Sequence, residues 1–147
     1  MKDQEIYRKI GELLWSIMPQ EADIIYFIGK IYPEHQEWIT RFMLKNGGLS
    51  TFDFGKEPSN IEMQISELVN GLKELDLFKE KWTHYKISLT DNGKFNIDFA
   101  YILEEDNWPN LFMKGIGELT EEEWEKDYSQ IPRELWEERV KFKNEKK

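Results

Sequence analysis

Residues 82–103 read WTHYKISLTDNGKFNIDFAYIL, two alternating apolar and polar runs on either side of Asp91-Asn92-Gly93. An alternation with a period of two is typical of a strand with one buried face, and an Asn-Gly pair between two such runs is a strong hairpin signal. The pattern predicts strands over Trp82–Thr90 and Lys94–Leu103. We expect Phe95, Ile97, Phe99 and Tyr101 to share the buried face, and His84 to point outward.

The residues before this hairpin predict a helix, two or three strands and a second helix. Apolar residues at helical spacing indicate a helix over residues 3–18, and Pro19 ends it. Runs rich in β-branched and aromatic residues predict strands at Ala22–Tyr32 and Glu37–Lys45, with a possible third at Leu49–Phe54. Ser59 and Glu62 have the spacing of a capping box, so a helix is expected to start there and to end near Phe78.

The residues after the hairpin predict two further helices. Thr120 and Glu123 form a second capping box, which begins a short helix carrying Trp124. Pro132 is suited to the first turn of a last helix, which carries Trp136. Trp15 and Trp82 are expected to pack rather than to make functional contacts.

Length and element order together predict the fold class. The 147 residues suit one domain, residues 1–147. The order is helix, strand, strand, an optional strand, helix, strand, strand, helix, helix. Because the strands are joined mainly by hairpins, we expect an α+β fold with an antiparallel sheet of four to five strands and helices on one face.

Composition excludes several classes of function. The chain has no cysteine, so it has no disulfides and no Cys-ligated metal. No apolar run approaches the roughly 18 residues that span a bilayer. The net charge of −9 disfavours direct binding to nucleic acid or to an anionic membrane, and it favours a basic partner.

Recognisable catalytic, metal and cofactor motifs are missing. The two histidines, His35 and His84, lie at no metal-ligand spacing and are interpreted as surface residues. The chain has no nucleophile elbow and no phosphate-binding glycine loop. We therefore expect no catalytic residues, no metal and no cofactor. A hydrolase with a carboxylate pair stays as one alternative, because 29 acidic residues make such pairs easy to form.

The excess negative charge is concentrated in one segment. Residues 104–127 hold nine acidic and two basic residues, together with several aromatic side chains. One interpretation is a solvated acidic loop and a helix start decorated with Glu. The other is an acidic, aromatic surface that binds a basic protein, with tryptophans as anchors.

The hairpin also carries a resemblance to a known family. Trp82-Thr83, Leu89 and the run from Gly93 to Tyr101 resemble the signature hairpin of the YezG-type antitoxin or immunity proteins. The N-terminal helix through Ile17-Met18-Pro19 is similar as well, and residues 130–136 match more weakly. Residues 31–58 match no pattern of the family.

The resemblance implies a cytoplasmic, non-enzymatic protein that neutralises a cognate secreted toxin, whose C-terminal domain is typically a nuclease. Since a nuclease surface that holds phosphates is basic, we expect an acidic surface of this protein to cover it. We expect no direct contact with nucleic acid or with a membrane. The sequence does not decide between a monomer and a dimer. The residues expected to bind the toxin are Glu104, Glu105, Asp106, Trp108, Glu121, Glu122 and Trp124. A second alternative is a non-catalytic adaptor domain that binds another basic protein.

Overall fold

The computed structural model describes residues 2–78 and 81–145 and shows one five-stranded antiparallel sheet. The strands are β1 (Ala22–Ile31), β2 (Gln36–Leu44), β3 (Leu49–Ser50), β4 (His84–Thr90) and β5 (Phe95–Ala100). Their order across the sheet is β3-β2-β1-β4-β5, so the two hairpins meet at β1 and β4. The α+β class and the element order predicted from the sequence are confirmed.

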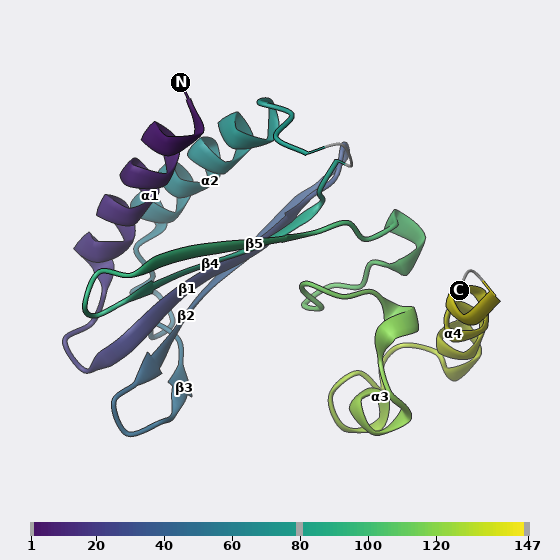
Figure 1. Cartoon of the computed structure of the whole chain (residues 1–147). Coiled ribbons are helices and arrows are strands. Elements are labelled where there is room, and N and C mark those ends of the chain that lie inside the picture. The colour runs from purple at the N-terminus through teal and green to yellow at the C-terminus, as the bar shows by residue number, and fades with distance from the viewer. Residues whose placement is uncertain (1, 79–80, 146–147) are drawn as a thin grey trace.

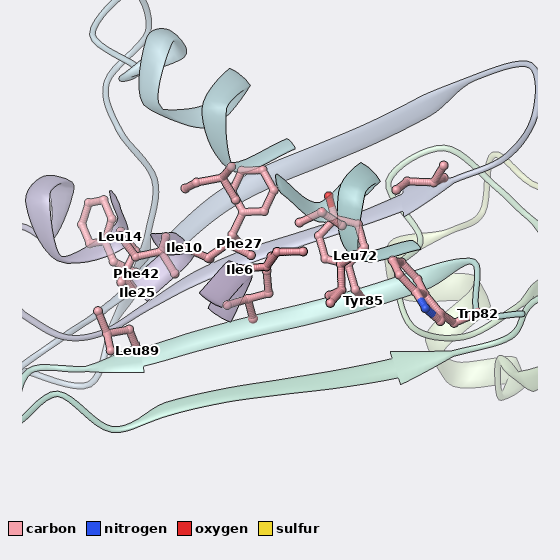
Figure 2. Close-up of a cluster of buried hydrophobic side chains, with 14 of the residues drawn as sticks. Ile6, Ile10, Leu14, Ile25, Phe27, Phe42, Leu72, Trp82, Tyr85 and Leu89 are labelled. Carbon is pink, nitrogen blue, oxygen red and sulfur yellow. The ribbon is translucent and has the colours of Figure 1, made fainter. Parts of the chain in front are cut away.

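Two antiparallel helices, α1 (Asp3–Ile17) and α2 (Ser59–Lys73), cover one face of the sheet (Figure 1). Between these helices and the sheet lies the main core, part of which Figure 2 shows. Ile10 and Leu72 from the helices meet Ile25, Phe27 and Ile87 from the strands, all fully buried. Each such side chain contributes roughly 2 kcal/mol through burial, so this layer holds the fold together.

The C-terminal part of the chain lies on the other side of the sheet (Figure 1). It contains two short 3-10 turns, η1 (Glu104–Asp106) and η2 (Ile116–Glu118), and the helices α3 (Glu121–Asp127) and α4 (Arg133–Glu145). These two helices do not join α1 and α2. They pack instead around a second hydrophobic cluster, whose buried members are Leu111, Ile116, Leu119, Ile131 and Trp136.

Several predicted boundaries and contacts are wrong. The third strand covers only Leu49–Ser50, and α2 ends at Lys73 rather than near Phe78. The Ser59–Glu62 capping box does not form, because α2 already includes Ser59 and the Glu62 carboxylate accepts a hydrogen bond from Thr40 at 2.6 Å. The second capping box is confirmed, with both Thr120–Glu123 bonds present.

Burial corrects three side-chain predictions, those for Tyr101, Trp15 and His84. Phe95, Ile97 and Phe99 pack at the margin of the core, as expected, but Tyr101 lies beyond the end of β5 and is 53% exposed. Trp82 is buried, whereas Trp15 is 55% exposed on α1. His84 does lie on the sheet face away from the helices, yet it is fully buried, because the C-terminal part covers it.

Candidate functional site

The structure divides the seven residues expected to bind a toxin into exposed and internal groups. Glu104 and Glu105 are exposed in η1, and Glu121 and Glu122 are exposed in the first turn of α3. Along the chain η1 follows β5, and Figure 1 shows α3 well apart from the end of β5. Asp106 is buried, and Trp108 and Trp124 are half-buried.

Ion pairs already neutralise part of the acidic segment. Asp106 Oδ1 lies 3.1 Å from Arg139 Nε and accepts a second bond from the Gly117 amide at 3.0 Å. Glu121 lies 3.5 Å from Arg133. Within the described residues, Glu104, Glu105 and Glu122 take part in no ion pair. No neighbouring cation among these residues offsets the three carboxylates.

Glu123 shows how the start of α3 uses a carboxylate for structure. Its side chain accepts from the Thr120 amide at 3.0 Å and pairs with Lys114. The Lys114 hydrogen bond, followed by the Thr120 amide, lowers the pKa of Glu123 to about 2. This carboxylate stabilises the helix start, so it differs from its unpaired neighbour Glu122.

Trp124 holds α3 against α4. Its ring stacks on Trp136 with centroids 5.6 Å apart, and its indole N–H donates to the Ile131 carbonyl at 2.8 Å. The Arg133 guanidinium lies over the Trp124 ring, 5.3 Å from its centroid. With its face stacked and its donor used, Trp124 is a packing residue that positions the α3 carboxylates.

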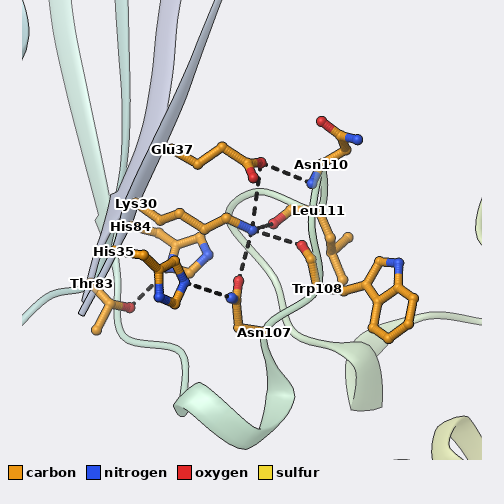
Figure 3. Close-up of polar contacts among 9 residues, drawn as sticks. All are labelled: Lys30, His35, Glu37, Thr83, His84, Asn107, Trp108, Asn110 and Leu111. Atoms are coloured by element: carbon orange, nitrogen blue, oxygen red, sulfur yellow. Dashed lines mark hydrogen bonds and ion pairs between the residues drawn. The ribbon is translucent and has the colours of Figure 1, made fainter. Parts of the chain in front are cut away.

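A buried lysine fixes the acidic segment to the sheet, as Figure 3 shows. Lys30 is 1% exposed and lies on the sheet face opposite the helices. Its ammonium donates to the Asn107 side-chain oxygen and the Trp108 carbonyl, both at 2.7 Å, and to the Leu111 carbonyl at 3.0 Å. An ammonium has three N–H donors, so this cage uses all of them.

Glu37 completes the anchor from the neighbouring strand. It lies opposite Lys30 in the β1–β2 register, with its carboxylate 3.9 Å from the ammonium. The same oxygen accepts the Asn110 amide at 2.8 Å, and Asn110 adopts a left-handed φ of 67° at this turn. Two side chains of the sheet thus hold residues 107–111, through three backbone groups and the side chain of Asn107.

Burial sets the ionisation of the two basic groups at the anchor. Desolvation lowers the pKa of Lys30 to about 8, although the Glu37 carboxylate opposes the shift. Desolvation and the nearby Lys30 charge lower the pKa of His84 to about 4. At neutral pH the anchor therefore holds a charged lysine beside a neutral imidazole, which keeps like charges apart.

The residues of the anchor were missed by sequence reasoning. Lys30 interrupts the apolar run of residues 24–31 in β1, and that interruption is the one local signal for a special role. Asn107 and Asn110 carry no signal, because their partners Lys30 and Glu37 lie more than seventy positions away in the chain. His35, by contrast, is exposed as expected.

The fold and this site define a class: a small α+β domain with charged surface groups on an anchored segment. Within the described residues, no group of three His, Asp or Glu side chains is placed to hold a metal ion. None of the described helices is long and apolar enough to cross a membrane.

The comparison with family models identifies the family. Residues 4–114 match the model described as "YezG-like: Immunity protein YezG-like", and this match covers most of the chain. The protein therefore belongs to the YezG-like immunity protein family. A search of curated proteins gives no match. An immunity protein has a cognate toxin as its partner, and this family membership suggests a non-catalytic role.

Proposed function

We propose that this protein inhibits a cognate nuclease toxin by placing acidic side chains of the C-terminal part over the toxin's basic, phosphate-binding surface. The observation that carries the proposal is the set of exposed carboxylates at Glu104, Glu105 and Glu122, which form no ion pair with residues 2–78 and 81–145. Fully exposed charges of one sign steer encounter with an oppositely charged protein and set which partner is accepted. The proposed function places the chain in the cytoplasm, where such a nuclease would meet nucleic acid.

The internal residues of the segment support binding by positioning it. Asp106 fixes η1 to η2 and α4 through Arg139, so Glu104 and Glu105 are held on a rigid turn. Trp124 does the same for Glu121 and Glu122 by joining α3 to α4. A preorganised set of charges loses little conformational entropy when the toxin binds.

Charge reversal tests the proposal. The partner is first isolated by copurification with the tagged chain, and its affinity for the wild type is then compared with that for Glu104→Lys/Glu105→Lys. We expect the double variant to bind more than about tenfold more weakly, which corresponds to about 1.4 kcal/mol. Association should also slow as salt concentration rises, because screening weakens electrostatic steering.

A matched control separates a local from a global effect of charge. Glu67→Lys/Glu74→Lys makes the same change in net charge at two exposed positions in and beside α2, on the other side of the sheet. This control should bind the toxin as the wild type does. Equal affinities for both double variants would refute the acidic surface at η1. A copurified partner that is a housekeeping protein, with no protection of cells against a toxin, would favour the adaptor alternative.

A further inference from the structure

Strand β5 leaves one edge of the sheet unpaired. It pairs with β4 on one side, and no described residue pairs with its other side. The carbonyls of Lys94 and Ala100 accept amide N–H groups of Thr90 and Thr83, which shows that these even-numbered residues bond toward β4. Peptide groups alternate in direction along a strand. Those of Phe95, Ile97 and Phe99 therefore point outward from the sheet, available to a further strand.

Apolar hollows flank both ends of this edge on the helix side. At the start of β5, a hollow is lined by Tyr7 and Trp15 of α1 together with Phe95, and Gln4, Arg8 and Glu12 also line it. At its end, a second hollow is lined by Phe78, Trp82, Ile97, Phe99 and Tyr101, and Asp98 also lines it. Trp15, Phe78 and Tyr101 are each about half exposed, at 55%, 49% and 53%. Exposed aromatic residues gathered along an edge are typical of an interaction surface.

The edge also lacks the features that normally block strand addition. Free edges are commonly protected by proline, by a bulge or by several charges. Residues 94–103 contain no proline, the β4–β5 register runs without a shift, and Asp98 is the one charged residue within β5. The backbone of this edge is therefore accessible to a further strand, and most side chains of β5 are apolar.

We propose that a second copy of this chain adds to this edge, with β5 pairing antiparallel to β5 of the other copy about a twofold axis at Ile97. In this register Phe95 lies opposite Phe99 of the second copy, and Asn96 lies opposite Asp98 of the second copy. Within one chain the Asn96 side-chain amide donates to the Asp98 carboxylate at 3.3 Å, and both side chains are exposed on the helix-free face. The same donor and acceptor types would meet across the twofold axis. The outward peptide groups of Phe95, Ile97 and Phe99 then pair with the corresponding peptide groups of the second copy.

The twofold axis also pairs the two hollows. Because the strands run in opposite directions, the Trp15 end of one copy meets the Tyr101 end of the other. Each copy thus offers the apolar surface that the other exposes, as an isologous contact requires. Moving the axis to residue 98 would set Asp98 against Asp98, and cross-strand like charges are unfavourable. This self-complementarity favours a second copy over an unrelated strand.

Substitutions at Asn96 test both the dimer and its register. We expect Asn96→Lys to strengthen self-association, since each lysine would face Asp98 of the second copy. Asn96→Asp should weaken it, because the same position then sets two carboxylates against each other. The difference in dimer dissociation constant should be about tenfold or more, as two such pairs form in each dimer. Asn96→Asp/Asp98→Lys should restore association.

Sedimentation equilibrium over protein concentrations up to about 1 mM gives the dissociation constants. The matched control is Ser88→Asp, which adds the same charge directly beside Asn96 but one strand inward from the edge. It should associate as the wild type does. Since each copy carries a net charge of −9, salt should promote this dimer, whereas salt should weaken toxin binding.

Three results would overturn the proposal. The first is a wild type that stays monomeric throughout the concentration range. The second is an equal effect of Asn96→Asp and Ser88→Asp, which would assign the change to net charge alone. The third is weaker association in Asn96→Lys, which would exclude this register. The experiment contains no toxin, so its outcome does not depend on the proposed inhibitory function.

Discussion

The ammonium of Lys30 lies 2.7 Å from the carbonyl oxygen of Trp108, a residue 78 positions later in the chain. This contact joins the central strand of the sheet to the segment that carries the acidic surface. Because the bond is made to backbone rather than to a side chain, it fixes where the segment lies without restricting which side chains it displays. The exposed carboxylates Glu104 and Glu105 are thus distinct from the residues that hold the segment to the sheet.

Removing the Lys30 charge should release the acidic segment. Lys30→Met keeps the length of the side chain but leaves the acceptors of Asn107, Trp108 and Leu111 without their donor. We expect a loss of about 2–4 kcal/mol in the free energy of unfolding, measured by urea denaturation. Hydrogen exchange should rise at the Asn110 amide, while amides in α1 stay protected. Lys86→Met, a change at a less buried lysine on the same face, serves as the control.

Acid should weaken the fold through His84. Its pKa is about 4 in the folded chain, against 6.5 for the free side chain. Between these values the unfolded state binds more protons than the folded state, so stability falls as the pH falls. The contribution is complete above pH 6.5 and is lost as the pH drops through 4.

The His84 contribution is measured as a difference between two variants. His84→Leu should flatten the fall in unfolding free energy between pH 6.5 and 4, because no buried imidazole remains to be protonated. His35→Gln, at an exposed position, should keep the wild-type pH dependence. Parallel curves for the wild type and His84→Leu would contradict the assignment to His84.

Two glycines should respond in opposite ways to alanine. A Cβ on Gly115 would lie 1.9 Å from the Asp106 carboxylate, in the buried pair with Arg139. Gly115→Ala should therefore cost about 2–3 kcal/mol, a typical penalty for overpacking. Gly71 lies within α2, where a Cβ meets Ile6 at an ordinary 3.9 Å. Gly71→Ala should stabilise the chain by about 0.5–1 kcal/mol through helix propensity.

Thermal unfolding of the two glycine variants checks this pair of predictions. Gly115→Ala should lower the midpoint and expose the cluster around Trp136 to solvent, seen as a red shift of tryptophan emission. Gly71→Ala should raise the midpoint. A Gly115→Ala variant as stable as the wild type would mean that Asp106 moves away without cost.

The fold was predictable wherever local pattern sets the structure. The alternation in residues 82–103 and the turn at Asn92-Gly93 depend on neighbours in the chain, and the structure confirms this hairpin. The Thr120 capping box is equally local, and both of its bonds form. The Ser59 box does not form, because α2 already includes Ser59 and the Glu62 carboxylate binds Thr40 of β2. The spacing of residues in the sequence cannot reveal that a side chain distant in the chain will compete for a capping residue.

The site was predictable only in part, for the same reason. Acid content marked the segment from Glu104 to Asp127, but composition does not reveal which carboxylates are paired. Asp106 is internal because Arg139 lies within reach after folding, whereas Glu105 has no such neighbour among the described residues. His84 follows an alternation that assigns it to the outer face correctly, yet its burial depends on a segment far along the chain.

The family match ends at residue 114, soon after the last backbone contact with Lys30, and α3 and α4 beyond it pack around a cluster of their own. That cluster also includes the side chain of Leu111, and the Leu111 carbonyl accepts a hydrogen bond from Lys30. One residue therefore links the central strand of the sheet to the packing of the C-terminal helices. A change in how α3 and α4 pack is transmitted to the sheet through Leu111.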